Sequence, residues 1–262
     1  MTSGFGIMAK IAVFNQKGGV GKTTTSLNIT AALSRRGLNP LSIDLDPQGH
    51  LSYVCGATVK HPDDSVFSFY QRSKTLTELI REGSSGWLVI PSHVELSRVD
   101  SSFGKGPNVL NLLNRGIVAE KLNTGRPIIM DCCPMLGVLS LSAIFASTRV
   151  LCPVSADYLA VKAVAEVEKT LKALERVLKR RVVRRFVITR FDVRRKMSHQ
   201  IYEELHERLG HELCNTRVSE NVSLAESPAA LSDIFSHAPS SRGAADYESL
   251  IEELMADGFM DN

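Results

Sequence analysis

The sequence predicts an α/β fold, a doubly wound and mostly parallel sheet flanked by helices on both faces. Three observations lead to this prediction. Short apolar runs alternate along the chain with segments in which apolar residues recur every three or four positions. A glycine-rich stretch, residues 15–25, lies between the first apolar run and the first helical segment. Two later apolar runs end in aspartates, Asp44 and Asp131, and the ligands of such sheets gather at the carboxyl ends of strands.

The chain has 262 residues, of which 44% are hydrophobic, and this is enough for one sizeable core. No apolar run reaches the length of a membrane span, and residues 1–7 lack the charged and apolar regions of a signal peptide. We therefore expect a cytoplasmic protein. Because a second methionine, Met8, stands just before the first apolar run, we interpret residues 1–7 as a disordered start or a cloning remnant and residues 8–262 as a single domain.

The first apolar run, Ile11–Phe14, is followed by Asn-Gln-Lys-Gly-Gly-Val-Gly-Lys-Thr-Thr-Thr. Glycines let successive backbone N–H groups point at an anion, and the helix that follows adds the positive end of its dipole. Lys22 is then expected at the β- and γ-phosphates, the Thr23 hydroxyl at Mg²⁺ and Thr24 at the α-phosphate. The alternative is a glycine-rich turn that binds nothing, and two lysines, three glycines and three threonines rarely coincide in this register. The sequence thus predicts that Mg-ATP is bound by Lys17, Gly18, Gly19, Val20, Gly21, Lys22, Thr23 and Thr24.

The general phosphate loop has glycine where this chain has Gln16, and here a second lysine, Lys17, follows. The pattern Lys-Gly-Gly-Val-Gly-Lys-Thr-Thr resembles the deviant Walker A loop of the ParA/MinD family of P-loop ATPases, and the resemblance extends from about Met8 to Met255. It implies a Mg-dependent ATPase that is slow without a partner. It also implies that Lys17 crosses to the partner subunit's nucleotide in an ATP-bound sandwich homodimer.

A helix is expected over residues 22–36, followed by a strand over residues 40–46. Acids at a strand's end project toward the phosphate loop, so Asp44 is expected near the Mg²⁺ or the attacking water. The segment resembles the family's Asp-x-Asp-Pro-Gln-Gly, in which the first acid is needed for hydrolysis, and this makes Asp44 a catalytic candidate with Lys17 and Lys22. The alternative is an acid that caps the next helix, which suits Asp46 better than Asp44.

Further on, the pattern predicts a strand over residues 87–92, a helix over 108–123 and a buried strand over 126–131. Residues 51–81 show only short helical pieces around 66–72 and 76–81. An apolar strand that ends in aspartate is the Walker B arrangement, so Asp131 is the candidate that holds the Mg²⁺ shell. The family continues Asp-Cys-Pro-Pro-Ser-Leu-Gly, and this chain has Cys133 in place of the first proline.

The remaining elements complete the predicted fold: strands over residues 150–154 and 186–189, and helices over residues 157–179, 198–209, 224–234 and 244–255. In the resemblance, the loop 190–196 and the turn 218–222 flank the adenine, which makes Arg190 a nucleotide-binding candidate. Five cysteines show no metal-ligand or disulfide spacing, and reduced thiols are expected. A cluster like that of the nitrogenase iron protein is excluded, because its cysteines lie elsewhere relative to the loop.

The net charge is +3, but cations gather in one stretch. Between residues 176 and 196 ten cations face a single acid, Asp192: Arg176, Lys179, Arg180, Arg181, Arg184, Arg185, Arg190, Arg194, Arg195 and Lys196. After Arg242 there is no Lys or Arg. Such asymmetry indicates a polyanionic partner, and the alternative, a solvated cationic helix end, explains only two or three charges.

A ParA-type positioning ATPase is the function that fits these patterns. Its ATP dimer coats nucleoid DNA without sequence preference, and a ParB-like or cargo-adaptor protein stimulates hydrolysis, so that a plasmid, a chromosome or a protein organelle is positioned. The DNA-binding residues are expected to be Arg181, Arg184, Arg185, Arg194, Arg195 and Lys196. Both arginines of the family's Ile-Pro-Arg-Asn-Val-Arg segment are absent, since Glu220 and Ser223 stand in their places.

Two other functions remain open. A MinD-type membrane ATPase would need a basic amphipathic C-terminal helix, whereas the last predicted helix is acidic, and no membrane partner is expected. A metabolic or cluster-carrying relative would need a cysteine pair or a substrate domain, and neither is visible.

Overall fold

A computed structural model describes residues 8–84, 86–104 and 106–261. The expectation of a disordered start at residues 1–7 lies outside this range. The described residues form a sheet of eight strands in the order β3-β4-β2-β5-β1-β6-β7-β8. The strands are β1 (Lys10–Val13), β2 (Leu41–Leu45), β3 (Arg81–Glu82), β4 (Leu88–Ile90), β5 (Ile128–Cys132), β6 (Arg149–Ser155), β7 (Val183–Phe191) and β8 (Leu213–Ser219).

The pairing is parallel except between β3 and β4. Strand β1 is central, because it pairs with β5 on one side and with β6 on the other. The chain leaves β1 toward β2 and later returns to β6 on its other side, so the end of β1 is the point where the strand order reverses. A doubly wound sheet binds its ligand at this point.

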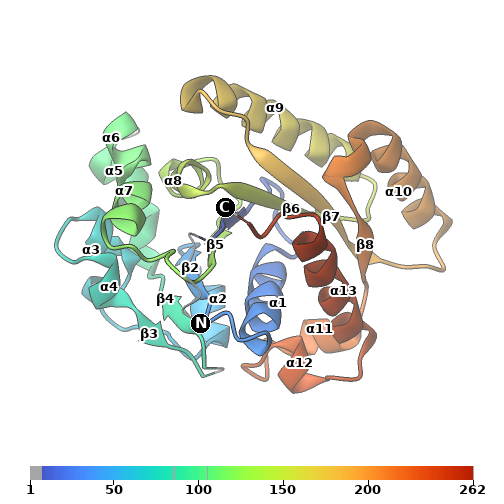
Figure 1. Cartoon of the computed structure of the whole chain (residues 1–262), viewed down its shortest axis with the longest axis horizontal. Helices are drawn as coiled ribbons and strands as arrows, with labels where there is room; N and C mark the ends of the chain where they lie inside the picture. Colours follow the sequence, from blue (N-terminus) through green and yellow to red (C-terminus); the bar gives the residue numbers. More distant parts are fainter. Residues whose placement is uncertain (1–7, 85, 105, 262) are drawn as a thin grey trace, which may run out of the picture.

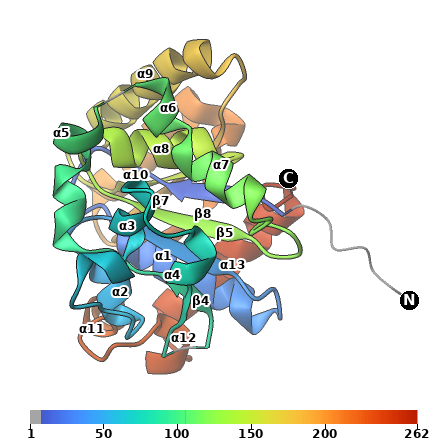
Figure 2. The same ribbon diagram turned by 90° about the vertical axis from the view of Figure 1, so that its left-hand side faces the viewer.

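Helices cover both faces of the sheet (Figures 1 and 2). The α-helices are α1 (Lys22–Arg35), α2 (His50–Val54), α3 (Val66–Tyr70), α4 (Leu76–Leu79), α5 (Val99–Phe103), α6 (Pro107–Leu110), α7 (Leu112–Ala119), α8 (Val138–Ala146), α9 (Ala160–Leu178), α10 (Lys196–Leu209), α11 (Val222–Glu226), α12 (Ile234–His237) and α13 (Arg242–Ala256). Three short 3-10 helices are η1 (Pro62–Asp64), η2 (Val94–Arg98) and η3 (Gly210–Glu212).

Alternation along the strands divides the core into two layers. Ile11 and Val13 of β1 pack with α1, α2 and α11–α13, whereas Ala12 of β1 and Phe14, the residue after β1, pack with the helices from α3 to α10. Successive side chains of a strand point to opposite faces, and both faces are covered, so every residue of β1 is buried. This explains why the strands of the sequence are continuous apolar runs.

The predicted fold class is confirmed, two local predictions need correction, and some elements were not predicted. The helix expected over residues 224–234 is two short ones, α11 and α12, because Pro228 has no N–H and Leu231 adopts a positive φ of 50°. The helix expected over 108–123 is divided into α6 and α7. Helix α8 and strand β8 were not predicted: α8 is apolar on almost all sides and shows no amphipathic period, and β8 is an edge strand with polar residues.

Candidate functional site

The glycine-rich loop joins β1 to α1 at the centre of the sheet. Gly19 and Gly21 have φ values of 73° and 86°, a left-handed conformation that favours glycine, and Gly21 is the N-cap of α1. Asn15 holds the loop in place, because its Nδ2 donates to the Pro153 carbonyl at 2.8 Å while its Oδ1 accepts the Lys17 N–H at 2.9 Å. The loop is thus fastened to β6 and presents the N-terminus of α1 to a ligand.

Three polar side chains of α1 turn toward the end of β5. Thr23 Oγ1 donates to Asp131 Oδ2 at 2.7 Å, and Ser26 Oγ donates to Asp131 Oδ1 at 2.9 Å. Lys22 Nζ lies 3.0 Å from the Lys17 carbonyl oxygen, inside the loop. Burial lowers the pKa of Lys22, and the charge of Asp131 opposes this shift. The residues predicted for the lysine, hydroxyl and Walker B positions therefore lie together.

Two buried carboxylates lie side by side behind the loop. Asp44 of β2 is directly opposite Asp131 of β5 in the register, and the two are 0% and 1% exposed. Burial raises the pKa of Asp131 to about 7, and the charge of Asp44 adds to this shift. Burial also raises the pKa of Asp44 to about 6, although hydrogen bonds from Ser52 lower it. A cation nearby would relieve the cost of this concentrated negative charge.

Asp44 does not face the cavity, contrary to the sequence-based expectation. Its Oδ2 accepts hydrogen bonds from Ser52 N and Ser52 Oγ, at 2.8 and 2.7 Å, and its Oδ1 accepts the Asp46 N–H at 3.1 Å. The carboxylate is fully buried, and its hydrogen bonds hold the turn after β2 in place. Asp46 is half-buried and lines the cavity instead.

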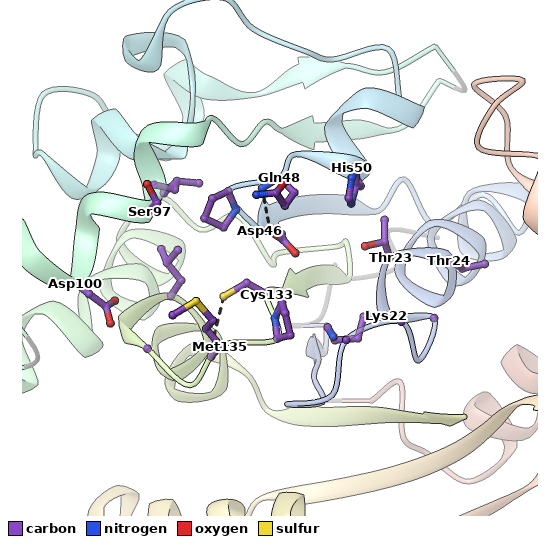
Figure 3. A pocket seen from close by; sticks show the side chains of 18 of the residues that line it. Lys22, Thr23, Thr24, Asp46, Gln48, His50, Ser97, Asp100, Cys133 and Met135 are labelled. Atoms are coloured by element: carbon purple, nitrogen blue, oxygen red, sulfur yellow. Dashed lines mark hydrogen bonds between the residues drawn. The ribbon is translucent and has the colours of Figure 1, made fainter. Parts of the chain in front are cut away.

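A cavity of about 640 Å³ opens in front of the loop (Figure 3). The side chains of Lys22, Thr23 and Thr24 come from one side, and the loops after β2 and β5 supply Asp46 and Cys133 from the other. Gln48 of the Asp-x-Asp-Pro-Gln-Gly segment also lines the cavity. Sequence reasoning missed further lining residues at the start of α2 and on η2 and α5, because no motif marks them: His50, Leu96, Ser97 and Asp100. Asp100 Oδ1 accepts the Val138 N–H at 2.8 Å and so fastens the N-terminus of α8.

The residues present fit Mg-ATP. An added Cβ at Gly18 or Gly19 would meet no atom within 4 Å, so the loop backbone is open toward the cavity. The hydroxyl of Thr23 and the carboxylate of Asp131 are oxygen donors of the kind that Mg²⁺ takes. Arg190, with a φ of 52°, is exposed and lines the same cavity beyond Gly21. Loop, lysine and oxygen ligands thus meet at one place.

Lys17 points away from this cavity. Its Nζ lies 2.6 Å from Asp157 Oδ1 and 2.7 Å from Asp157 Oδ2, in the loop after β6. Its neighbour Gln16 donates from Nε2 to Thr170 Oγ1 on α9 at 2.8 Å. The lysine expected to act in a partner subunit is therefore held within its own chain.

The cations that cluster in the sequence are separated in space. Arg181, Arg184 and Arg185 lie before or at the start of β7, whereas Arg194, Arg195 and Lys196 follow its end. At about 3.3 Å per residue, the nine residues of β7 place these groups on opposite edges of the sheet, about 30 Å apart. Arg194, Arg195 and Lys196 lie on the same edge as the phosphate loop, and we call these three residues the β7–α10 basic loop.

The first group does not form the expected exposed row. The side chain of Arg184 is 7% exposed, and its Nε lies 2.9 Å from Glu212 Oε2. Arg185 forms an ion pair with Asp257, and Arg181 lies 3.1 Å from Glu212. The prediction that Arg184 contacts DNA therefore fails on burial, because a guanidinium enclosed by its own acids is not available to phosphates. By contrast, Arg194 and Arg195 in the β7–α10 basic loop are 86% and 58% exposed beside Asp192.

Three further observations concern other classes of site. Within the described ranges, no helix is long and apolar enough to cross a membrane. No group of three or more His, Cys, Asp or Glu among these residues is arranged to hold a metal ion. The five cysteines are buried and unpaired in the part of the chain that the structure describes, and burial raises the pKa of Cys132 and Cys133.

Known proteins resemble this chain over almost its whole length. Residues 8–183 match a family described as an AAA domain. The chain is 33% identical to the chromosome-partitioning ATPase Soj of Thermus thermophilus, over 94% of this chain and 95% of that protein. It is 31% identical to the sporulation initiation inhibitor protein Soj of Bacillus subtilis, over 95% and 98%. A solved structure of cobyrinic acid a,c-diamide synthase from Mycobacterium smegmatis, with bound ATP analog and magnesium, matches with a TM-score of 0.80 and 25% identity, over 94% of this chain and 93% of that one.

Proposed function

The chain belongs to the ParA/Soj family of ATPases with a deviant Walker A loop, and from this premise we propose that it is a DNA-riding positioning switch. ATP brings two copies together, the dimer binds DNA without sequence preference, and hydrolysis releases it. A ParB-like or cargo-adaptor protein stimulates the slow hydrolysis, and a plasmid, a chromosome or a protein organelle is positioned as a result. The protein would work in the cytoplasm, on the nucleoid.

The observation that carries the proposal is the group formed by the phosphate loop, Thr23 and Asp131 around one cavity. Lys22 and the backbone of Gly18–Thr24 bind the phosphates, and Thr23 and Asp131 hold Mg²⁺. When bound, Mg²⁺ supplies positive charge at the phosphate oxygens. We assign the positioning of the attacking water to Asp46, because it lines the cavity, whereas Asp44 is buried behind it. Asp44 supports this carboxylate by accepting the Asp46 N–H.

Dimerisation is supported by apolar side chains around the loop. Met135 is 74% exposed and Tyr158 is 86% exposed, on the loops that follow β5 and β6. These strands flank β1, so both side chains lie on the edge that carries the phosphate loop. Exposed apolar side chains gathered at one edge suit burial against a second copy. On dimerisation Lys17 would leave Asp157 and stabilise the charge that develops on the partner's γ-phosphate.

DNA binding is supported by the β7–α10 basic loop. Arg194, Arg195 and Lys196 are exposed on the nucleotide edge, and the hydrogen bonds that Arg194 donates lower the pKa of Asp192 to about 2. Asp192 is therefore charged at neutral pH and orders both arginines without covering them. Such cations bind phosphates regardless of sequence, with affinity that falls as salt rises.

One experiment tests the core of the proposal. Wild-type protein and Lys22→Ala are titrated with Mg-ATP, and each is then mixed with a random-sequence DNA duplex in no nucleotide, ADP or ATP. We expect salt-sensitive DNA binding only for wild type with ATP, and at least about a hundredfold weaker nucleotide binding for Lys22→Ala, because the fixed charge at the phosphates is lost. Wild type that turns over ATP but binds no DNA in any state would refute the DNA-riding function.

A further inference from the structure

The outer face of α9 carries cations that have no role in the proposed function as described above. Lys162, Lys169 and Arg176 are spaced by seven residues, so they form a line along the helix with about 10 Å between neighbours. The opposite face, with Val164 and Leu171, is buried against the sheet. Lys172 and Lys179 lie next to this line. We call the five residues together the α9 basic row: Lys162, Lys169, Lys172, Arg176 and Lys179. All five residues are exposed.

Of the three acids of α9, Glu168 and Glu175 pair with arginines outside this row, and Glu166 is exposed beside it. Glu168 Oε2 lies 2.7 Å from Arg208 on α10. Glu175 Oε1 accepts the Val182 N–H at 3.0 Å and lies 3.6 Å from the buried Arg184. Among the described residues, no member of the α9 basic row forms an ion pair. Glu168 and Glu175 thus pair with arginines outside the α9 basic row, and the five cations of the row stay exposed to solvent.

The positive charge continues beyond the end of α9. An open depression of about 630 Å³ is lined by Lys172, Glu175, Arg176, Lys179, Arg180 and Arg181. Burial and the charge of Arg149 lower the pKa of Arg180, and Arg180 in turn adds to the lowering of the pKa of Lys10 by burial. These cations repel one another across the edge of the sheet opposite the phosphate loop. A bound anion would relieve this repulsion.

The chemistry of the surface selects the kind of partner. A protein partner would need an apolar centre depleted in charge. The apolar surface between the cations is small. It consists of Val177, which is 64% exposed, and the small side chain of Ala173 beside it. Phosphate contacts need only exposed Lys and Arg. The surface therefore suits a nucleic-acid backbone better than a protein.

We propose that the α9 basic row is a second contact surface for the DNA backbone, an inference that rests on the proposed DNA-riding function. Helix α9 packs beside α10, whose start carries the β7–α10 basic loop (Figure 1). Its 19 residues span about 28 Å, which is about eight base pairs of B-form DNA. The row supplies cations on a rigid helix. It thereby replaces the two arginines of the family's segment after β8, where this chain has Glu220 and Ser223.

The test compares two triple variants with the same change in charge. Lys169→Gln/Lys172→Gln/Arg176→Gln removes the centre of the row. The control, Lys60→Gln/Arg115→Gln/Lys121→Gln, removes three exposed cations elsewhere in the fold. Binding to a random-sequence duplex in Mg-ATP is measured across a salt series, with basal ATP turnover as a check on folding. A parallel arm measures sedimentation with vesicles of phosphatidylglycerol and phosphatidylcholine.

We expect the α9 variant to bind DNA at least about tenfold more weakly than the control at 0.1 M salt. We also expect the slope of log affinity against log salt to become shallower by about 2 to 3, because about 0.9 is lost per phosphate contact. Equal affinity and slope for the two variants, with wild type binding DNA, would overturn this inference and leave the proposed function standing. Vesicle binding that the α9 variant alone loses, with DNA binding intact, would overturn it in favour of a lipid surface. Wild type that binds no DNA in any nucleotide state would instead refute the proposed function itself.

Discussion

Lys17 forms a short ion pair with Asp157 of its own chain, with 2.6 Å between Nζ and Oδ1. Both side chains are partly exposed, at 28% and 40%. Asp157 Oδ1 also accepts the Leu159 N–H at 2.9 Å, just before the start of α9. The pair thus joins the phosphate loop to the helix after β6, and it has to open if Lys17 reaches a second subunit.

Replacing this acid should make dimerisation easier. In Asp157→Asn the acceptor for Leu159 remains, but the charge that holds Lys17 is gone. Because partly exposed pairs contribute up to about 1 kcal/mol, ATP-dependent dimers should form at roughly two- to fivefold lower protein concentration, as measured by analytical ultracentrifugation. As a counterpart, Lys17→Ala should bind ATP but neither dimerise nor hydrolyse it. Hydrolysis by Lys17→Ala at the wild-type rate would exclude the sandwich dimer.

The two aspartates after β2 should have separable roles. Asp46→Ala should keep ATP affinity but lose hydrolysis by about a hundredfold or more, because a water-positioning carboxylate is removed from the cavity wall, and the ATP dimer should accumulate. Single-turnover hydrolysis and ATP titration measure the two quantities. If Asp46→Ala hydrolysed ATP normally while folded Asp44→Ala trapped the dimer, the role would return to Asp44, as the sequence suggested.

The nucleotide-free protein should become less stable as pH rises from about 4 to about 7. The folded-state pKa of Asp44 is raised to about 6 and that of Asp131 to about 7. A raised pKa means that the folded state holds the proton more tightly, so the stabilisation present at low pH is lost as pH rises through these values. Melting temperatures across this range measure the effect, and saturating Mg-ADP should flatten it. A decline of unchanged size in Asp131→Asn would assign the effect to other groups.

Arg184 should matter for stability and not for DNA. Arg184→Met removes the buried one of the two arginines that pair with the nearly buried Glu212, and should cost about 3 kcal/mol of unfolding free energy, with DNA affinity unchanged in the folded fraction. The exposed Arg194→Met is the matched variant, and we expect the reverse result: normal stability and weaker DNA binding. Urea unfolding and duplex titration measure both. Weaker DNA binding by a stable Arg184→Met would show that this residue is accessible after all.

Local pattern was enough to predict most of the fold. The strands β1, β2, β4, β5, β6 and β7 and the long helices α1, α9, α10 and α13 have apolar runs or stripes that only one secondary structure can bury. Helix α8 could not be found in this way, because a helix buried on almost all sides has no periodic contrast. Strand β8 was missed because an edge strand pairs on one side only and keeps polar residues such as Asn215 and Thr216.

The sequence by itself determined the chemistry of the phosphate loop. Glycines, a lysine and a threonine in one short stretch indicate phosphate binding. The position of Asp131 near this loop follows because the carboxyl ends of parallel strands lie at the same edge of the sheet. These features are local, or depend only on which end of a strand a residue occupies.

Tertiary structure alone decided which charges are available. Burial separates Asp44 from Asp46 although only Leu45 lies between them, and β7 carries Arg184 and Arg194 to opposite edges of the sheet. Lys17 meets an acid 140 positions away in the chain. Charge density along a sequence carries no information on such pairing, because ion pairs and solvation depend on distances in space, which only the packed fold defines.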